Sequence, residues 1–233
     1  MHCLWCHSTF IESISWQFVF GRSTPMPLCE QCKPRLEKIK GDICQKCGRP
    51  FTDLDPKYRV GDLCSDCHSW GEAALIKNRS LYVYNDFLQE VIARWKFRGD
   101  AELVKLFWPS LQKLLSDYEK IDVVVPIPLS SQRLYERSFN QAIALAESIP
   151  FPIIEALLKP EDTVKQSKKT RKQRLEKKLE FQLAPNLQNK IQGKTILLVD
   201  DIYTTGATLY AAAGVLRAIG GAEKVFAVTV ARG

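Results

Sequence analysis

The pattern of hydrophobic and polar residues divides the chain into two parts. From Ser80 onward, short apolar runs alternate with longer stretches that have the spacing of amphipathic helices. Such apolar runs are typical of parallel strands that are covered on both faces, and helices are the usual connections between them. The pattern therefore predicts an α/β domain at 80–233 with a parallel sheet flanked by helices. A small cysteine-rich domain at 1–70 and a linker at 71–79 precede it.

The same periodicity predicts the individual elements. In the α/β part, the predicted strands are 81–84, 121–126, 151–158, 196–199 and 225–230, and the predicted helices are 87–97, 103–118, 132–149 and 209–219. In the cysteine-rich part, alternating apolar and polar residues over 10–20 predict a short strand or hairpin arm. The carboxyl ends of parallel strands lie at a common edge of the sheet, where ligands bind in such folds. We therefore expect the ligand-binding residues at that edge.

The densest chemical signal follows the predicted strand at 196–199, where two carboxylates precede a loop that opens a helix. Such a loop is an anion site, because unpaired backbone N–H groups and the helix dipole favour a phosphate. Two carboxylates beside it suit a ribose diol on a phosphorylated sugar, or a divalent metal that bridges to it. A lone Asp-Asp pair would be an ordinary solvated connection, but the full spacing favours a phosphosugar site. The candidate residues are Asp200, Asp201, Thr204, Thr205, Gly206, Ala207 and Thr208.

A second candidate ligand loop follows the predicted strand at 121–126. It leads into a predicted helix on which Arg133 and Arg137 lie four apart, so that two guanidinium groups on one face can clamp a pyrophosphate. The alternative is a solvated basic helix face. Because both loops leave the carboxyl ends of central strands, we expect them to meet in one crevice. The residues of this loop are Pro128, Leu129, Ser130 and Ser131.

All eight cysteines lie in the first 67 residues, as four Cys-x-x-Cys pairs. In a reducing compartment such pairs present four thiolates to zinc, and we favour two structural zinc sites over a disulfide framework or a redox pair. Sequential pairing of the knuckles gives a tandem zinc ribbon, and the spacing leaves an interleaved arrangement open. The adjacent His2, His7 and His68 are expected at the surface. The predicted ligands are Cys3, Cys6, Cys29, Cys32, Cys44, Cys47, Cys64 and Cys67.

Composition limits the class of protein. The chain has 233 residues, 45% hydrophobic and 25% charged, which predicts a soluble globular protein of one ordinary domain and a small one. No apolar run approaches the roughly 20 residues that span a membrane. The N-terminal segment has no basic stretch before an apolar one, so no secretory signal is predicted and a cytoplasmic location is expected.

Most of the net charge comes from one polar segment. Residues 159–178 carry nine basic and three acidic side chains, a net charge of +6 against +7 for the whole chain. This segment is interpreted as a solvated loop, a lid over polyphosphate or a patch for single-stranded nucleic acid. Only Phe181 lies nearby for base stacking, which weakens the nucleic-acid interpretation. The candidate nucleic-acid contacts are Lys168, Lys169, Arg171 and Lys172.

Several motifs together resemble the ComF family over essentially the full length. Besides the cysteine knuckles and the Asp-Asp loop, they are Lys96-Phe-Arg-Gly-Asp100, Pro126-Ile-Pro-Leu129 and Arg133-x-x-x-Arg-Ser-Phe-Asn-Gln141. The resemblance implies a double zinc ribbon joined to a type I phosphoribosyltransferase-like domain. It further implies a role in natural transformation, in which single-stranded DNA is taken up across the cytoplasmic membrane. The implied partners are the ATPase ComFA and the DNA-processing protein DprA, which would bring the protein to the inner face of the membrane.

The resemblance also implies roles for the candidate residues. Asp200 and Asp201 would hold the ribose diol and Mg²⁺ of 5-phosphoribosyl pyrophosphate (PRPP) and act in catalysis, and the loop at 204–208 would hold the 5′-phosphate. The loop at 128–131, with Arg133 and Arg137, would contact the pyrophosphate. The implied reaction is displacement of pyrophosphate at the anomeric carbon, through a transition state that resembles an oxocarbenium ion.

Two positions depart from the family pattern. Thr204 stands where purine-using relatives often carry an acidic general base, and a threonine cannot take a proton near neutral pH. Ser138 replaces the usual glycine. Three functions therefore remain: a competence factor that binds PRPP, an active phosphoribosyltransferase with an unknown acceptor, and a zinc-ribbon scaffold with a vestigial sugar-phosphate site.

Overall fold

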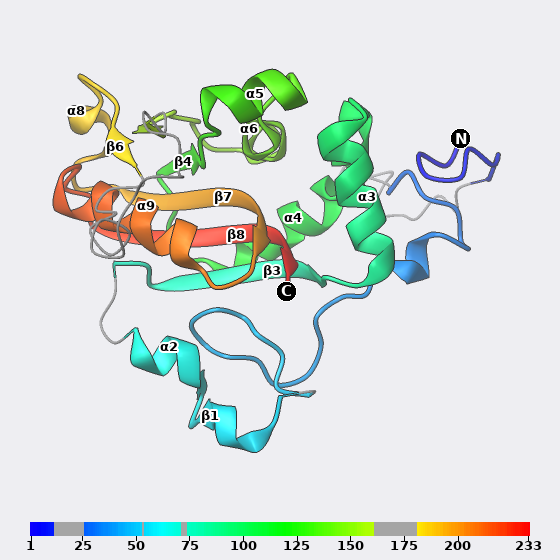
Figure 1. The fold of residues 1–233 in the computed structure, drawn as a ribbon, viewed down its shortest axis with the longest axis horizontal. Coiled ribbons are helices and arrows are strands. Elements are labelled where there is room, and N and C mark those ends of the chain that lie inside the picture. Colours follow the sequence, from blue (N-terminus) through cyan, green and yellow to red (C-terminus); the bar gives the residue numbers. More distant parts are fainter. Residues whose placement is uncertain (12–25, 53, 71–73, 161–180) are drawn as a thin grey trace, which may run out of the picture.

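A four-stranded parallel sheet forms the centre of the α/β part (Figure 1). In the computed structural model, which describes residues 1–11, 26–52, 54–70, 74–160 and 181–233, the strand order is β3-β8-β7-β4. The strands are β3 (Lys77–Val83), β4 (Val123–Pro126), β7 (Thr195–Tyr203) and β8 (Lys224–Arg232). All three pairings are parallel, as predicted. The chain crosses from strand to strand through helices, because parallel neighbours need such connections.

The remaining elements surround this sheet. The α-helices are α2 (Ser65–Ser69), α3 (Asp86–Phe97), α4 (Trp108–Leu114), α5 (Ser131–Arg137), α6 (Gln141–Ala146), α8 (Gln188–Ile191) and α9 (Ala207–Ala218). Short 3-10 helices are η1 (Lys33–Arg35), η2 (Pro56–Tyr58), η3 (Ala101–Leu106) and η4 (Leu115–Asp117), and the two-residue strands are β1 (Arg59–Val60), β2 (Leu63–Cys64), β5 (Leu157–Leu158) and β6 (Gln182–Leu183). None of the helices within the described ranges is both long and apolar enough to cross a bilayer.

The two faces of the sheet carry two separate hydrophobic cores. Successive side chains of a strand point to opposite faces, so Leu197 and Val199 of β7 pack with α3, α4 and α6, in what we call the first core. Ile196 and Leu198 pack with α9 in the second core. The continuous apolar run of β7 is thus explained by burial on both faces.

The cysteine-rich part wraps around the edge of the sheet at β3. Three of its first four cysteines lie in the first core, whereas its last four lie in the second core. Between them, Lys38 forms an antiparallel bridge with Tyr82, and the Val83 N–H donates to the Glu37 carbonyl at 2.9 Å. This contact covers an edge that would otherwise expose unpaired backbone groups. Figure 1 shows the N-terminal segment beside α3 and the α2 region on the other side of β3.

The structure corrects several predicted boundaries. The predicted helix at 103–118 is divided into η3, α4 and η4, with Pro109 in the first turn of α4, where its missing N–H costs no hydrogen bond. The predicted helix at 132–149 is also broken, because Ser138 takes a left-handed φ of 65° and Asn140 caps a new helix, α6. The glycine usual in the family suits this left-handed conformation without a steric cost.

Three strand predictions also change. Strand β3 begins at Lys77, four residues before the predicted start. Of the predicted strand at 151–158, only β5 and an isolated bridge from Ile153 to Val124 form. Strand β7 does not end before Asp200 but continues to Tyr203, because β8 offers partners as far as Arg232. Most of the hairpin arm predicted at 10–20 lies outside the described residues, and the division into domains stays a prediction.

We expect the second core to depend strongly on β7. Leu198 is fully buried, so Leu198→Ala should lower the free energy of unfolding by about 2–5 kcal/mol through lost burial and a residual cavity. Chemical denaturation followed by circular dichroism measures this change. Ile219→Ala is the control, since Ile219 is 47% exposed, and it should cost far less. Equal losses in the two variants would contradict the described core.

Candidate functional site

The two carboxylates of the candidate site lie on β7 and point to opposite faces of the sheet. They are neighbours in a strand, and the backbone N–H of Asp201 donates to the Asp200 carboxylate at 2.8 Å. Asp201 faces α3, where Lys96 forms an ion pair with it, with 2.5 Å between the lysine Nζ and the carboxylate. Both of these side chains are largely buried, which strengthens the pair relative to a surface one.

Asp200 has an unusual protonation equilibrium. Burial, and after it the nearby negative charge of Asp201, raise the pKa of Asp200 to about 7. The hydrogen bond from the Asp201 N–H and the positive charges of Lys96 and Lys159 act in the opposite direction. Near neutral pH the carboxyl of Asp200 is therefore poised between its neutral and charged forms, and both an incoming hydroxyl and a cation favour the charged form.

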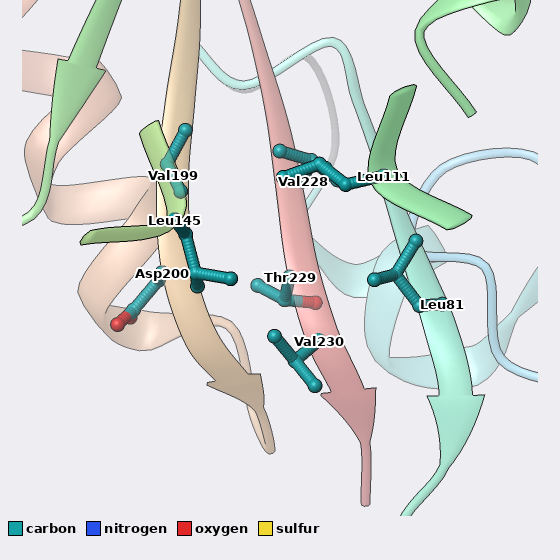
Figure 2. A pocket seen from close by; sticks show the side chains of 8 residues that line it. All are labelled: Leu81, Leu111, Leu145, Val199, Asp200, Val228, Thr229 and Val230. Atoms are coloured by element: carbon teal, nitrogen blue, oxygen red, sulfur yellow. The ribbon is translucent and has the colours of Figure 1, made fainter. Parts of the chain in front are cut away.

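A small apolar hollow lies next to Asp200 but does not suit a phosphosugar. Leucine and valine side chains of β3, α4, α6, β7 and β8 line it, together with Asp200 and Thr229 (Figure 2). The Asp200 carboxylate points away from Thr229 and Val230. The polar end of Asp200 is thus turned from the hollow, and the candidate ligand groups are found at the end of β7 instead.

The loop after β7 has the features of an anion site. It spans Thr204 to Gly206 before α9 begins at Ala207, and the N–H groups of Thr205 and Gly206 donate to no carbonyl of the described residues. Gly206 has a φ of 83°, and a Cβ there would lie 2.2 Å from the Tyr203 hydroxyl oxygen. Glycine is required on both counts. Ala207 and Thr208 are in the first turn of α9, so the structure places the whole predicted loop at the start of a helix.

The second predicted loop is anchored to β7. The Ile127 N–H donates to the Val199 carbonyl at 3.0 Å, and the Asn140 side chain donates to the Ile127 carbonyl at 3.0 Å. Pro128 to Ser131 lead into α5, whose first turn is capped by the Ser130 hydroxyl. The chain segment before α5 is therefore fixed beside the carboxyl end of β7.

The two predicted arginines differ in their surroundings. Arg137 lies over the ring of Phe97, with 5.3 Å between its guanidinium carbon and the ring centroid, and it donates to Gln141 at 2.9 Å. Its buried Nε has no hydrogen-bond partner among the described residues. Buried donors are usually paired, so this one is available to an acceptor on a ligand. Arg133, by contrast, is exposed on α5. The structure therefore brings Arg137 over the ring of Phe97 at the end of α3 and leaves Arg133 exposed.

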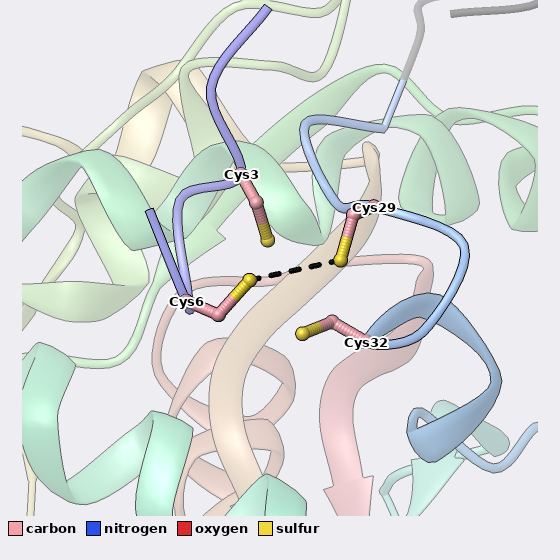
Figure 3. A group of neighbouring side chains, drawn as sticks. All are labelled: Cys3, Cys6, Cys29 and Cys32. Atoms are coloured by element: carbon pink, nitrogen blue, oxygen red, sulfur yellow. Dashed lines mark hydrogen bonds between the residues drawn. The ribbon is translucent and has the colours of Figure 1, made fainter. Parts of the chain in front are cut away.

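The eight cysteines form two tetrads in sequential order. Cys3, Cys6, Cys29 and Cys32 make the first cluster, and Cys44, Cys47, Cys64 and Cys67 make the second, with all sulfur atoms of a cluster within 4.8 Å of one another. The interleaved alternative is thereby excluded. The view of the first cluster in Figure 3 shows the four sulfur atoms turned toward a common centre, with 3.7 Å between the Cys6 and Cys29 sulfurs.

This geometry fits zinc. Four sulfurs around Zn²⁺ with bonds of about 2.3 Å lie roughly 3.8 Å apart, and the Cys47 to Cys64 distance is likewise 3.7 Å. All eight thiols are free, so no disulfide competes for them. His2, His7 and His68 are exposed as expected. Gly48 follows its knuckle with a φ of 73°, as the tight turn requires.

Sequence reasoning assigned no role to three residues at this site. Lys96 stood in a noted motif, but a helical pattern cannot show that it reaches Asp201. Tyr203, which was assigned to no element, is the last residue of β7 and lies beneath Gly206. Arg232 lies at the end of β8 and donates to the Tyr203 and Thr204 carbonyls. The candidate nucleic-acid residues Lys168, Lys169, Arg171 and Lys172 lie outside the described residues.

Comparisons with known proteins agree with this architecture. Residues 109–233 match the family model of the phosphoribosyl transferase domain. Competence protein ComFC of Bacillus subtilis (strain 168) is 39% identical over 99% of this chain and 94% of its own length. Competence protein ComFC of Streptococcus pneumoniae (strain R6) is 34% identical over 90% of each chain.

More distant matches were also found. Competence protein F of Haemophilus influenzae is 26% identical over 82% of this chain and 91% of its own length. Among solved structures, the allosteric regulatory enzyme of purine biosynthesis is 22% identical over 51% of this chain and 24% of that chain, with a TM-score of 0.36. This structural similarity is too low to carry an argument.

The fold and the matching family model define the class of protein. The chain contains a phosphoribosyl transferase domain with a parallel sheet flanked by helices, preceded by two cysteine tetrads compatible with a zinc ribbon. At 39% identity over nearly the full length, the chain belongs to the ComF family of competence proteins, with ComFC proteins among its relatives.

The pKa of Asp200 leads to a prediction for stability. Because the pKa is about 7 in the folded chain and near 3.8 without burial, the folded state holds the proton more tightly, and stability falls as the pH rises between these values. Asp200→Asn removes this loss. In buffers without divalent cations, the variant should melt several degrees above the wild type at pH 8 and close to it at pH 4. The exposed control Asp62→Asn should show no such contrast, and an Asp200→Asn effect equal at both pH values would rule out the raised pKa.

Proposed function

We propose that the carboxyl end of β7 binds PRPP or a related phosphorylated ribose together with Mg²⁺, in a protein that serves DNA uptake during natural transformation. The observation that carries the proposal is the loop before α9. Its N–H groups at Thr205 and Gly206 have no carbonyl partner among the described residues, and a Cβ at position 206 would collide with the Tyr203 hydroxyl, so only glycine allows this loop conformation. Such a loop, with the dipole of α9 behind it, suits a 5′-phosphate.

The carboxylates support the ribose part of the proposal. Asp200 and Asp201 follow the apolar run of β7 and come shortly before the loop that opens α9, at the same end of the strand. Ionised carboxylates accept hydrogen bonds from a diol, and they also bind Mg²⁺ through oxygen. Mg²⁺ would neutralise charge on a pyrophosphate group. Lys96 balances Asp201 and can turn toward a phosphate when a cation binds there.

Arg137 supports the pyrophosphate part. Its Nε donor is buried without a partner in the described chain, and its guanidinium lies over the ring of Phe97 at the end of α3. A fixed guanidinium with a free donor is well suited to a phosphate oxygen. Arg133 and the residues from Pro128 to Ser131 remain candidate contacts for the same group.

The role in competence rests on the relatives. Proteins that are 39% and 34% identical over almost the whole chain are named competence protein ComFC. By family resemblance, we place this chain on the cytoplasmic side of the membrane, where it would handle incoming single-stranded DNA with the ATPase ComFA and the DNA-processing protein DprA. The basic segment at 159–178 supplies the charge for a DNA contact.

Transfer of the ribosyl group is the second candidate function. The Lys96 ammonium beside Asp201 and the Arg137 guanidinium would stabilise a departing pyrophosphate, which favours catalysis. Thr204, however, offers no general base, and its carbonyl is engaged by Arg232 at 2.9 Å. We therefore place ligand binding first and turnover second. A scaffold with a vestigial site is the outcome if no phosphosugar binds.

Calorimetric titration of the zinc-loaded protein with PRPP and Mg²⁺ tests the proposal. We expect saturable binding by the wild type and at least a tenfold loss of affinity in the Asp200→Asn/Asp201→Asn double variant, since both carboxylates that face the diol and the metal lose their charge. Glu223→Gln, an exposed acidic position away from the site, is the matched control and should bind as the wild type does. If the folded, zinc-loaded wild type gave no heat of binding, PRPP would be excluded as the ligand.

A separate titration addresses DNA. Replacing Lys168, Lys169, Arg171 and Lys172 by Ala should weaken binding of a fluorescent single-stranded oligonucleotide and make the slope of log affinity against log salt shallower by roughly 3 units, since each phosphate contact contributes about 0.7. Fluorescence anisotropy at several salt concentrations measures both quantities. Arg49→Ala, Lys57→Ala and Arg59→Ala together form a control in the zinc ribbon. If the segment variant keeps the wild-type slope, the segment is not the DNA contact.

A further inference from the structure

The second cysteine cluster lies directly behind the candidate phosphate loop. Its four cysteines are at most 2% exposed and belong to the second core, together with Tyr203 and Tyr210. Tyr203 precedes the loop and Tyr210 lies in the first turns of α9, which follows it. The cluster and the residues that flank the loop therefore share one core, although well over one hundred residues separate them along the chain.

Arg232 connects the cluster to the loop. This arginine ends β8 and is only 5% exposed. One of its terminal nitrogens, Nη1, donates to the carbonyls of Tyr203 at 3.2 Å and Thr204 at 2.9 Å, while Nη2 lies 4.0 Å from the Cys47 sulfur. Its guanidinium carbon is 4.7 Å from the centroid of the Tyr203 ring. A planar guanidinium can contact the two carbonyls and the cysteine sulfur at the same time, because its donors point in fixed directions.

A second connection runs through the tyrosines. The Tyr210 hydroxyl lies 4.0 Å from the Cys67 sulfur, and the Tyr210 ring stacks on Trp70, three residues after Cys67, with 4.4 Å between ring centroids. The Tyr203 ring lies beneath Gly206 so closely that no Cβ would fit. A displacement of Tyr203 would thus change the position of Gly206, where one of the free N–H donors is found.

The charge of the second cluster explains why bound zinc would affect the contact between Arg232 and the loop. Four thiolates around Zn²⁺ carry a net charge of −2, and the buried guanidinium of Arg232 partly balances it from the side of Cys47. Without the metal, the four sulfurs have no common ligand to hold them, and Arg232 loses the fixed anionic partner that sets its direction. The guanidinium that binds the Tyr203 and Thr204 carbonyls is then no longer held in a fixed direction.

The first cluster offers a contrast within the same molecule. Its buried cysteines belong to the first core, on the α3 face of the sheet, and the hydrogen bonds of its sulfur atoms in the described chain run to Ser8 and to one another. No described contact leads from it to the loop at 204–206. It provides an internal control with the same ligand chemistry.

We propose that Arg232 is a positioning residue that couples zinc in the second cluster to the phosphate loop, so that zinc there and the phosphosugar at the loop favour each other, while zinc in the first cluster has no such effect. The identity of the ligand rests on the proposed function, but the link between cluster and loop does not. Coupling of this kind is reciprocal, so it can be measured from either side.

The first measurement is alkylation of individual cysteines by iodoacetamide in the presence of a zinc chelator, resolved by peptide mass spectrometry. In the wild type, PRPP with Mg²⁺ should slow alkylation of Cys44, Cys47, Cys64 and Cys67 about fivefold or more, within the usual range of coupling. Alkylation of the first cluster should not change. Equal rates with and without PRPP, in a sample for which calorimetry shows binding, would overturn the coupling and leave the proposed function intact.

Variants identify the residue responsible. Arg232→Gln should abolish the protection, and Arg232→Lys should restore only part of it, because an ammonium keeps the charge without the planar fork. Arg79→Gln is the matched control, since Arg79 donates to the Gln45 carbonyl inside the same knuckle but does not contact the loop. Full protection in folded, zinc-loaded Arg232→Gln protein would exclude Arg232 as the connection.

A third measurement needs neither ligand nor variant. Hydrogen exchange of the wild type should speed up at 203–208 when the chelator removes zinc from the second cluster, as identified by the alkylation of its cysteines. Loss of zinc from the first cluster alone should leave that exchange unchanged. Unchanged exchange at 203–208 after loss of zinc from the second cluster would contradict the coupling, whatever the calorimetric result with PRPP.

Discussion

The parallel pairing of β7 with β8, continued to Tyr203 and Arg232, is the constraint on which the rest of the structure depends. It carries β7 past the point at which its apolar run ends, so the two aspartates lie on a strand with fixed directions. It also brings the last residue of β8 beside the start of the phosphate loop. If the pairing stopped at Val199, neither the carboxylates nor the loop would have a defined position.

The cysteine-rich part acts on this framework from both faces. Its first cluster packs against α3, which carries Lys96 and Phe97, and its second cluster packs beneath Tyr203 and α9. The bridge from Lys38 to Tyr82 joins these two halves around the edge of the sheet. The cysteine-rich part therefore supports the elements that carry the candidate site, and metal ions bound by its thiolates would stabilise that support.

The sequence predicted the four main strands, the eight cysteine ligands and the loop that opens α9, because each rests on local pattern. It left the pairing of the four Cys-x-x-Cys knuckles open, and the structure groups them in sequential order. It missed features that depend on contacts distant in sequence. The extension of β7 required knowledge of the β8 register, the Lys96 to Asp201 pair required the position of α3, and the role of Arg232 required the packing of the second cluster. The breaks at Pro109 and Ser138 were missed because helical periodicity continues across both. The phosphosugar, the partners and DNA binding remain predictions.

The most direct test of the account is a crystal structure of the zinc-loaded protein with PRPP and Mg²⁺. The account predicts a 5′-phosphate within hydrogen-bond distance of the Thr205 and Gly206 N–H groups, the ribose diol beside the carboxylates of β7, and Arg232 still bound to the carbonyls of Tyr203 and Thr204. A phosphosugar bound elsewhere, or a loop that has moved away from Arg232 with the ligand in place, would contradict it.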